Sequence, residues 1–474
     1  MHNNKLITIL KHFNKSDLNQ FHKYIVSPYF NKSKQLIKFH EIILKGINSP
    51  KISLLEKENV WKKLFTEQKY NDVRFRKLNS DLLKMIEGFL SQQIFDENNL
   101  QKVANLIESV GIKGIEKLYS SAMRIATNET EKYPYEDADF HLKQYQIQKN
   151  YYEIIQHEFK HSERQNLEEI DKNLDNFYLA EKLRYMCAAL SQKQRGAHKY
   201  DLSFESEVIN LIKAKKSNLT PAEAIYYQIY LTYVEEENVD HYYQLKSILK
   251  KYSLKFHSIE GKTLYDSTIN YCVKKLNKGN SNFLLETFDI YEDYLKKGLI
   301  YIDDELDPFH FKNIVVIALR VGKYDWTENF IHTNKQRLPK ASRENAVTFN
   351  LARLHYYKKD YEKVISLLQE VEYEDIVYSL SSKSLLIATY YENNEIEALY
   401  SLLESFRVYL NRRKDIPDIW KRSRRNLIKF TKKLIRIVPG DNKAIEKIKE
   451  EIENTADGIA DVKWLKEKIS ELEK

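Results

Sequence analysis

A pattern of residues near the C-terminal end of this 474-residue chain recurs after 34 positions. The first copy and the second copy pair as follows: Leu351-Ala352 with Leu385-Leu386, Tyr356-Tyr357 with Tyr390-Tyr391, Asp360 with Asn394, Val364 with Ala398, and Leu368 with Leu402. A helix–turn–helix hairpin of this length cannot bury its apolar face alone, so copies must stack on one another. The repeat therefore predicts an all-α fold, in the form of a helical-hairpin solenoid.

Glycine and proline, which punctuate strand-rich folds, are scarce, with 11 Gly and 8 Pro in the whole chain. Long helices joined by short polar loops need few of either. Capping residues mark the helix starts instead. Thr220-Pro221-Ala222-Glu223 and Ser53-x-x-Glu56 both have the pattern of a capping box, and Asn71 and Asp307 stand before further predicted helices. These signals extend the all-α prediction to the rest of the chain.

The predicted helix starts and ends divide the chain into three regions. Residues 1–97 form an N-terminal helical domain, and residues 98–302 form an irregular region of long hairpins. Residues 303–474 hold the repeats, a basic helix and a last helix. The apolar residues of that last helix, among them Leu465 and Ile469, share one face. Such a helix is suited to capping the end of a solenoid.

The stretch 351–402 resembles tetratricopeptide repeats. Ala352, Tyr361, Val364 and Leu368 occupy that family's small, aromatic, small and large positions, and Ala398 and Leu402 do so in the next copy. The second copy departs from the pattern at Leu386 and Glu395, and neither copy has the closing proline. The resemblance implies a scaffold, since tetratricopeptide proteins mostly bind peptides or partner helices.

The whole chain is also similar to uncharacterised all-helical cytoplasmic proteins of low-GC bacteria. The block Ser27-Pro28-Tyr29-Phe30-Asn31 and the pair Trp464-Leu465 in the last helix carry this second resemblance. It implies no activity.

The leading hypothesis from the sequence is a non-catalytic scaffold or adaptor that binds a partner protein or peptide in a helical-repeat groove. The candidate groove residues are the paired tyrosines Tyr356, Tyr357, Tyr390 and Tyr391. Adjacent residues on a helix point about 100° apart, so at least one tyrosine of each pair is expected in the core.

Positive charge is concentrated in residues 407–436, which hold twelve Lys or Arg and two acids, whereas the whole chain has a net charge of +8. On a helix starting near Pro417, one stripe collects the cations Arg422, Arg425, Lys429, Lys432, Lys433 and Arg436. Trp420, Leu427, Phe430 and Leu434 form the opposite, apolar face. Three interpretations stay open for this basic stripe: a solvated helix face, a site for an acidic protein segment, or a site for nucleic-acid phosphates.

One short motif suggests metal chemistry. His157-Glu158-Phe159-Lys160-His161 has the H-E-x-x-H spacing that places two histidines on one helix face for zinc, with the glutamate as general base. Lys160 adds a cation between the ligands, and the sequence offers no strand to align a substrate. We therefore favour a solvated face or packed histidines. The chain also lacks nucleotide-binding loops and a nucleophile elbow, so we expect no cofactor and no enzyme activity.

The two cysteines, Cys187 and Cys272, stand in apolar helical contexts and are expected to be buried thiols. The apolar run at residues 6–10 is too short for a signal peptide, and no run approaches the ~20 residues needed to span a bilayer. The sequence therefore predicts a cytoplasmic protein without membrane insertion. It leaves the oligomeric state open.

Overall fold

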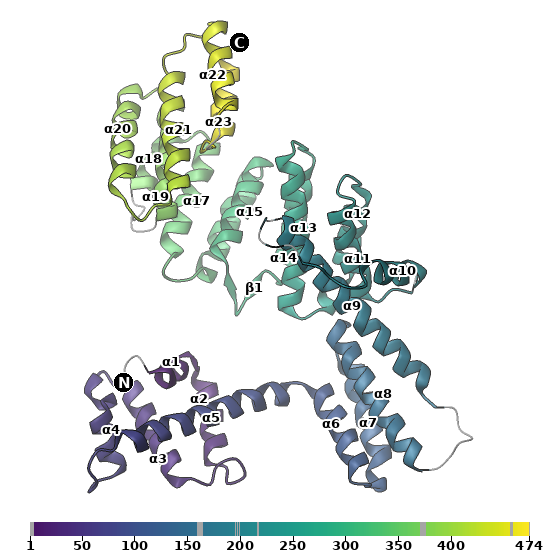
Figure 1. Cartoon of the computed structure of the whole chain (residues 1–474). Coiled ribbons are helices and arrows are strands. Elements are labelled where there is room, and N and C mark those ends of the chain that lie inside the picture. The colour runs from purple at the N-terminus through teal and green to yellow at the C-terminus, as the bar shows by residue number, and fades with distance from the viewer. Residues whose placement is uncertain are drawn as a thin grey trace. The chain divides into compact units, whose positions relative to one another are not determined.

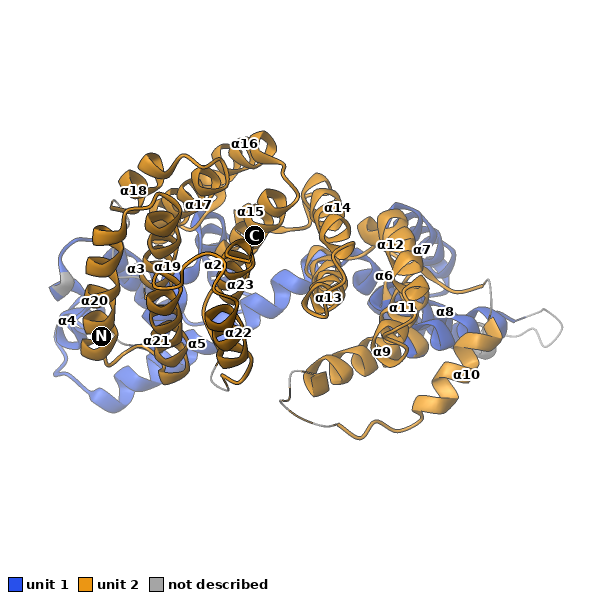
Figure 2. Cartoon of the chain, turned by 90° about the horizontal axis from the view of Figure 1, so that it is seen from above, with its two compact units in different colours: residues 1–134, 138–178 blue, residues 135–137, 179–474 orange. Residues whose placement is uncertain are grey.

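The computed structural model describes residues 4–158, 165–194, 196, 198, 200–215, 218–369, 376–455 and 458–473, apart from the side chains of 52 and 155–158. Helices make up nearly all of it (Figure 1), which confirms the all-α prediction. The chain divides into two compact units (Figure 2). Unit 1 comprises residues 1–134 and 138–178, and unit 2 comprises residues 135–137 and 179–474.

Unit 1 contains a first group of helices around a core that includes Phe21, Phe39 and Phe75, and a second group around Leu100 and Ile107. Its helices are α1 (Lys5–His12), α2 (Lys15–Val26), α3 (Lys34–Ile47), the 3-10 turn η1 (Ile52–Leu55), α4 (Lys57–Leu64), α5 (Asp72–Glu97), α6 (Asn99–Ile112), η2 (Glu116–Leu118), α7 (Tyr119–Lys132), α8 (Ala138–Glu158) and the first part of α9 (Leu167–Gln194).

Unit 2 takes the rest of α9 and all later elements. They are α10 (Glu205–Lys215), α11 (Pro221–Val234), α12 (Asp240–Tyr252), η3 (Ser253–Lys255), α13 (Ser258–Asn277), α14 (Phe283–Lys296), β1 (Tyr301–Ile302), β2 (Glu305–Leu306), α15 (Pro308–Arg320), α16 (Tyr324–Asn334), η4 (Lys335–Arg337), α17 (Arg343–Tyr357), α18 (Tyr361–Gln369), α19 (Ile376–Glu392), α20 (Ile396–Arg412), α21 (Asp418–Leu434), α22 (Asn442–Glu453) and α23 (Val462–Glu471).

Neighbouring helices in unit 2 pack in sequence order. From α11 to α23 each helix contacts the next one, and α15, α17 and α19 also contact one another in turn. Figure 2 shows α16, α18 and α20 along an outer arc and α15, α17 and α19 along an inner arc. In this part of unit 2, α15, α17 and α19 thus form an inner side.

Three hairpins of unit 2 share one turn. A residue with a left-handed backbone follows α15, α17 and α19, at Gly322 (φ 82°), Lys359 (φ 61°) and Asn394 (φ 58°). In each hairpin the N–H of the next residue donates to the carbonyl five residues back, at 2.9 Å. This is the Schellman arrangement, which satisfies the last carbonyl groups of a helix. The same local geometry therefore ends the first helix of each hairpin.

These turns correct the register of the repeat to 35 residues, from Lys359 to Asn394, in place of the predicted 34. Val364 and Leu368 correspond to Leu399 and Leu403, and all four side chains are fully buried. A shift of one residue rotates a helical position by about 100°. The turn and the buried positions therefore set a structural repeat of 35 residues. The two tyrosine pairs repeat after 34 residues in the sequence, so they occupy structural positions that differ by one residue.

Most predicted helix starts are confirmed. Thr220 forms its capping box with Glu223, Asn71 caps α5 and Asp307 caps α15. The prediction at Ser53 is wrong, because this residue lies inside η1, and α4 begins at Lys57 without a side-chain cap. The division of the chain at residues 97 and 302 stays a prediction.

Both cysteines are buried, as predicted. Burial raises the pKa of the Cys272 thiol to about 12 and raises that of Cys187 further, so neither is poised to react as a thiolate. Within the described residues, no helix is both long enough and apolar enough to span a membrane.

Candidate functional site

A groove of about 650 Å³ lies among α13, α14 and α15 in unit 2. Three amide side chains line it, those of Asn270, Asn277 and Asn313. Two apolar side chains in its lining are open to solvent: Phe309 is 67% exposed and Val273 is 38% exposed. Amides both donate and accept hydrogen bonds, so the groove combines polar pairing groups with apolar contact area. We call it the inner groove.

Charged side chains hold one wall of the inner groove in place. The Lys262 ammonium donates to Asp266 Oδ2 at 2.8 Å and lies 3.1 Å from His310 Nε2. Burial acts to raise the pKa of Asp266, but hydrogen bonds from His310 and Lys262 outweigh it and lower the pKa below its usual value. The contacts among Lys262, Asp266 and His310 hold these side chains in place, and Asp266 and His310 give this wall of the groove its polar groups.

Lys312 of α15 shares a helix face with two residues of the inner groove. Lys312, Val316 and Arg320 are spaced four residues apart, so they lie on one face of the helix. Val316 and Arg320 line the groove. Lys312 is not part of the groove lining, and the positive charge of Arg353 of α17 acts to lower its pKa.

Lys312, Arg353 and Arg424 form what we call the cation cluster, with one residue each from α15, α17 and α21. Burial lowers the pKa of all three, and repulsion from the two arginines lowers that of Lys312 further. One carboxylate, that of Asp461, acts on all three in the opposite direction. Arg353 Nη1 and Arg424 Nε are buried and have no hydrogen-bond partner among the described residues.

Two of the four predicted groove tyrosines, Tyr356 and Tyr391, lie next to α23. Glu392 Oε1 accepts hydrogen bonds from Tyr356 (3.4 Å) and from Trp464 Nε1 (3.2 Å) of α23. Tyr391 packs edge-on against the Trp464 ring, with 5.4 Å between centroids.

The other two tyrosines differ from each other in exposure. Tyr390 packs against the core of the last helices. Tyr357 is the most open of the four, at 36% exposure, and lies 6.5 Å from the Tyr324 ring. Three of the four predicted tyrosines are therefore largely covered by the chain itself.

Five cations of the predicted basic stripe lie on α21, which begins at Asp418 with Pro417 as its N-cap: Arg422, Arg425, Lys429, Lys432 and Lys433. Arg436 lies in a turn beyond the end of this helix at Leu434. Lys432 pairs with Glu404 and Lys433 pairs with Glu451. The other four, Arg422, Arg425, Lys429 and Arg436, are exposed.

The opposite face of α21 matches its prediction in part. Leu427, Phe430 and Leu434 are buried, as expected. Trp420 remains partly exposed near the start of the helix, with the Arg424 guanidinium 6.0 Å from its ring centroid. Arg424 thus lies beside Trp420 and belongs to the cation cluster, not to the stripe.

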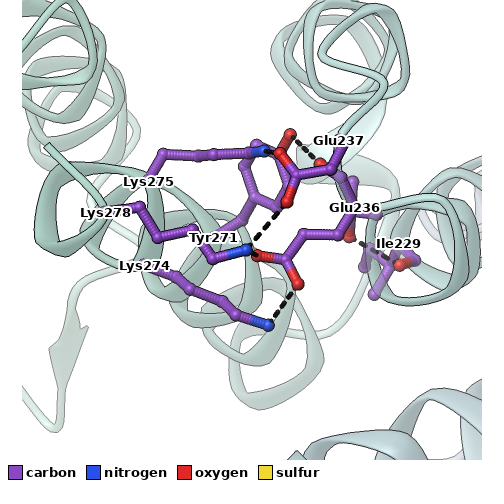
Figure 3. A network of polar contacts seen from close by, with 8 residues as sticks. Ile229, Glu236, Glu237, Tyr271, Lys274, Lys275 and Lys278 are labelled. Carbon is purple, nitrogen blue, oxygen red and sulfur yellow. Dashed lines mark hydrogen bonds and ion pairs between the residues drawn. The ribbon is translucent and has the colours of Figure 1, made fainter. Parts of the chain in front are cut away.

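A further charged network joins the α11–α12 loop to α13 (Figure 3). Glu236 pairs with Lys274 (2.6 Å) and Lys278 (2.7 Å), and Glu237 pairs with Lys275 and Lys278 (both 2.8 Å). Hydrogen bonds from the lysines lower the pKa of Glu237 to about 2. Since its acids and lysines are matched to one another, the network serves to hold the two hairpins together.

The H-E-x-x-H motif falls where the structure gives no side-chain geometry. His161 lies outside the described residues, and His157 is within α8 but its side chain is not described. The described part of the chain contains no group of three His, Cys, Asp or Glu side chains able to hold a metal ion. The metal hypothesis for His157 and His161 is therefore left as a sequence prediction.

In comparisons with protein-family models, curated proteins and solved structures, nothing matched this chain.

Sequence reasoning missed the inner groove and the cation cluster. The pair Asn270 and Asn277 carried a usable signal, because a spacing of seven places two amides on one helix face. The cation cluster had no comparable signal in the sequence. Lys312 stands ten residues before its hairpin turn at Gly322, whereas Arg353 stands six before Lys359, so no shared repeat position marks them.

Proposed function

We propose that this protein is a cytoplasmic, non-catalytic adaptor built as a tetratricopeptide-like solenoid, which binds a segment of a partner protein along its inner face. The sequential packing of α11 to α23 and the shared turn of three hairpins support this architecture. Stacked hairpins of this kind create an extended surface on one side, which suits the binding of a peptide or helix.

The observation that carries the proposal is the composition of the inner groove. A polypeptide segment presents backbone donors and acceptors together with apolar side chains. Asn270, Asn277 and Asn313 offer matching amides, and Phe309 and Val273 offer exposed apolar surface. Apolar side chains left open in a groove of mixed polarity are typical of an interaction site.

Site-specific photo-crosslinking in cells tests this function. A photoreactive phenylalanine analogue at Phe309 should capture a discrete protein that survives nuclease treatment. The matched control is Leu285 of α14, which is similarly exposed at 62% but is not part of the groove lining. Equal capture from both positions, or none from Phe309, would contradict a partner site in the inner groove.

The exposed part of the basic stripe supports a second candidate function, a nucleic-acid or ribonucleoprotein-associated factor. Arg422, Arg425 and Lys429 lie on one side of α21, where backbone phosphates would meet them, and such binding is strongly salt-dependent. This alternative predicts that nucleic acid is recovered with the wild-type protein when it is purified from the same cells. Changing these three residues to Glu should abolish that recovery. Recovery unaffected by the triple change would remove it.

A further inference from the structure

A second cavity, of about 530 Å³, lies in unit 1 among α2, the loop that follows it and α5. Tyr24, Phe30 and Phe89 form an aromatic wall in its lining. The Tyr24 and Phe30 rings are stacked, with 4.2 Å between centroids and 20° between planes. Phe89 is buried and Phe30 is exposed, so the wall runs from the core out to solvent. We call this cavity the aromatic pocket, and its polar lining includes Gln20, Lys23, Gln92, Gln93, Asp96 and Glu97.

The loop that carries Phe30 is held in place by its own hydrogen bonds. Asn31 is buried, and its Nδ2 donates to the Ile25 carbonyl at 2.8 Å while its Oδ1 accepts from the Ser33 N–H at 2.9 Å. The Tyr29 ring lies edge-on to the Phe30 ring at 5.1 Å and is 87% exposed. The loop therefore presents aromatic surface to solvent in a fixed conformation, which lowers the entropy cost of binding a partner.

Hydrogen bonds within the chain leave the aromatic pocket rich in acceptors. The Nε2 groups of its glutamines already donate: that of Gln20 to Ser16 (3.4 Å), that of Gln92 to Asp96 (3.0 Å), and that of Gln93 to Asp17 (3.2 Å) and Gln20 (3.3 Å). The Oε1 atoms of Gln92 and Gln93 accept no hydrogen bond from the described residues. A ligand that suits these oxygens must itself be a hydrogen-bond donor.

The charge of the lining also favours a cation. Asp96 and Glu97 lie in the last turn of α5, which holds no basic residue, and neither carboxylate forms an ion pair with the described residues. The C-terminal end of a helix carries partial negative charge, so acids there do not stabilise it. Lys23 supplies one positive charge against these two negative ones, which leaves the lining with a net charge of −1.

We propose that the aromatic pocket binds an arginine side chain of a partner protein. A guanidinium group is planar and stacks on aromatic rings, and it carries five N–H donors and no acceptor. Phe30 offers the ring surface, and Asp96 and Glu97 offer the charge. A polypeptide is favoured over a free guanidinium compound because Tyr29 and Val26 extend the exposed apolar surface beyond the lining of the pocket.

Fluorescence anisotropy on the full chain tests the inference. The probe is a fluorescein-labelled peptide with one arginine between two leucines, compared with the same peptide carrying citrulline, which has nearly the shape of arginine without its charge. We expect the arginine peptide to bind about tenfold more tightly, because only a guanidinium group makes charge-assisted hydrogen bonds to the carboxylates. A lysine peptide should also bind more weakly, since an ammonium group does not lie flat on a ring.

Charge changes in the lining should act with opposite signs. Glu97→Gln should weaken binding of the arginine peptide about three- to tenfold, because it removes a carboxylate, and Lys23→Gln should tighten it about threefold, because it removes a like charge. Phe30→Leu should weaken binding about threefold through loss of the aromatic face. Glu87→Gln is the matched control, since Glu87 is an exposed acid of the same helix outside the lining. Circular dichroism verifies that each variant is folded.

Equal binding of the arginine and citrulline peptides would overturn the inference, as would effects of the same sign in Glu97→Gln and Lys23→Gln, or an equal loss in Glu87→Gln and Glu97→Gln. Absence of arginine-peptide binding by both the wild type and Lys23→Gln would overturn it too. The aromatic pocket shares no residue with the inner groove, which belongs to unit 2. The inference therefore goes beyond the proposed function, and crosslinking from Phe309 tests that function separately.

Discussion

His40 in unit 1 shows how a single buried residue couples stability to pH. Its side chain is fully buried, and neither ring nitrogen has a hydrogen-bond partner among the described residues. The Phe21 ring meets it edge-on at 4.9 Å, and the His22 ring stacks on it at 6.0 Å. Burial, and then repulsion from His22, lower the pKa of His40 to about 4.

We predict that unit 1 loses stability as the pH falls from about 6.5 to about 4. Over this range the unfolded chain binds a proton at His40 while the folded chain does not, so protonation favours unfolding. Each pKa unit is worth ~1.4 kcal/mol, which gives a total of roughly 3 kcal/mol. Above pH 6.5, His40 is neutral in both the folded and the unfolded state, so its protonation no longer lowers the free energy of unfolding.

His40→Leu should abolish this acid-dependent loss, since leucine does not titrate and leaves no polar atom unpaired. Hydrogen exchange of α3 amides at pH 7 and pH 4.5 measures the effect. An unchanged pH dependence in the variant would show that other groups carry the acid sensitivity. His22→Gln is the matched control and should reduce the loss only slightly, because it removes the repulsion and not the burial.

At the scale of the element, the hairpin turns differ in the free energy that their left-handed residue costs. Lys359 and Asn394 adopt left-handed backbones at the position that Gly322 fills in the preceding hairpin. A left-handed conformation costs a side chain with a Cβ roughly 1 kcal/mol, and asparagine tolerates it better than lysine. The turn between α17 and α18 therefore carries strain that glycine would relieve.

We predict that Lys359→Gly raises the free energy of unfolding of unit 2 by up to about 1 kcal/mol, and that Asn394→Gly raises it less. The control is Lys358→Gly, one residue earlier at φ −76°, where glycine only adds entropy to the unfolded chain and should destabilise. Urea denaturation midpoints measure all three. The same sign for Lys359→Gly and Lys358→Gly would contradict the left-handed turn.

At the scale of the whole molecule, α23 closes the stack of unit 2 while unit 1 has cores of its own. Leu465 and Ile469 belong to the same buried cluster as Leu380, Leu427 and Ile448. Unit 1 draws on separate clusters, which include Phe39 and Leu100. Separate cores predict that the two units respond separately to core mutations.

Leu465→Ala should therefore destabilise unit 2 by about 2–5 kcal/mol, through lost burial and the cavity left behind, without changing unit 1. Hydrogen exchange read separately for α3 and α21 measures both units in one experiment. Lys466→Ala, at the next and exposed position of α23, is the control and should change neither unit. A parallel loss of protection in α3 would show that the units unfold together.

What could be predicted from the sequence is what short stretches of chain decide. The starts at Asn71, Thr220 and Asp307 were predictable because a cap involves only a few consecutive residues. The buried face of α21 followed from helical periodicity. The capping box expected at Ser53 failed because a 3-10 turn took its place before α4 began.

The sequence by itself determined that this protein is built from helices, where several of them begin and which face of α21 is buried, since the 3.6-residue period and the caps act within one element. Only the tertiary structure decided the 35-residue register, the covering of Tyr356 and Tyr391 beside α23, and the influence of the Arg353 and Arg424 charges on Lys312. Those features depend on contacts between residues far apart in the chain, and such contacts follow from how the hairpins stack and not from any local pattern.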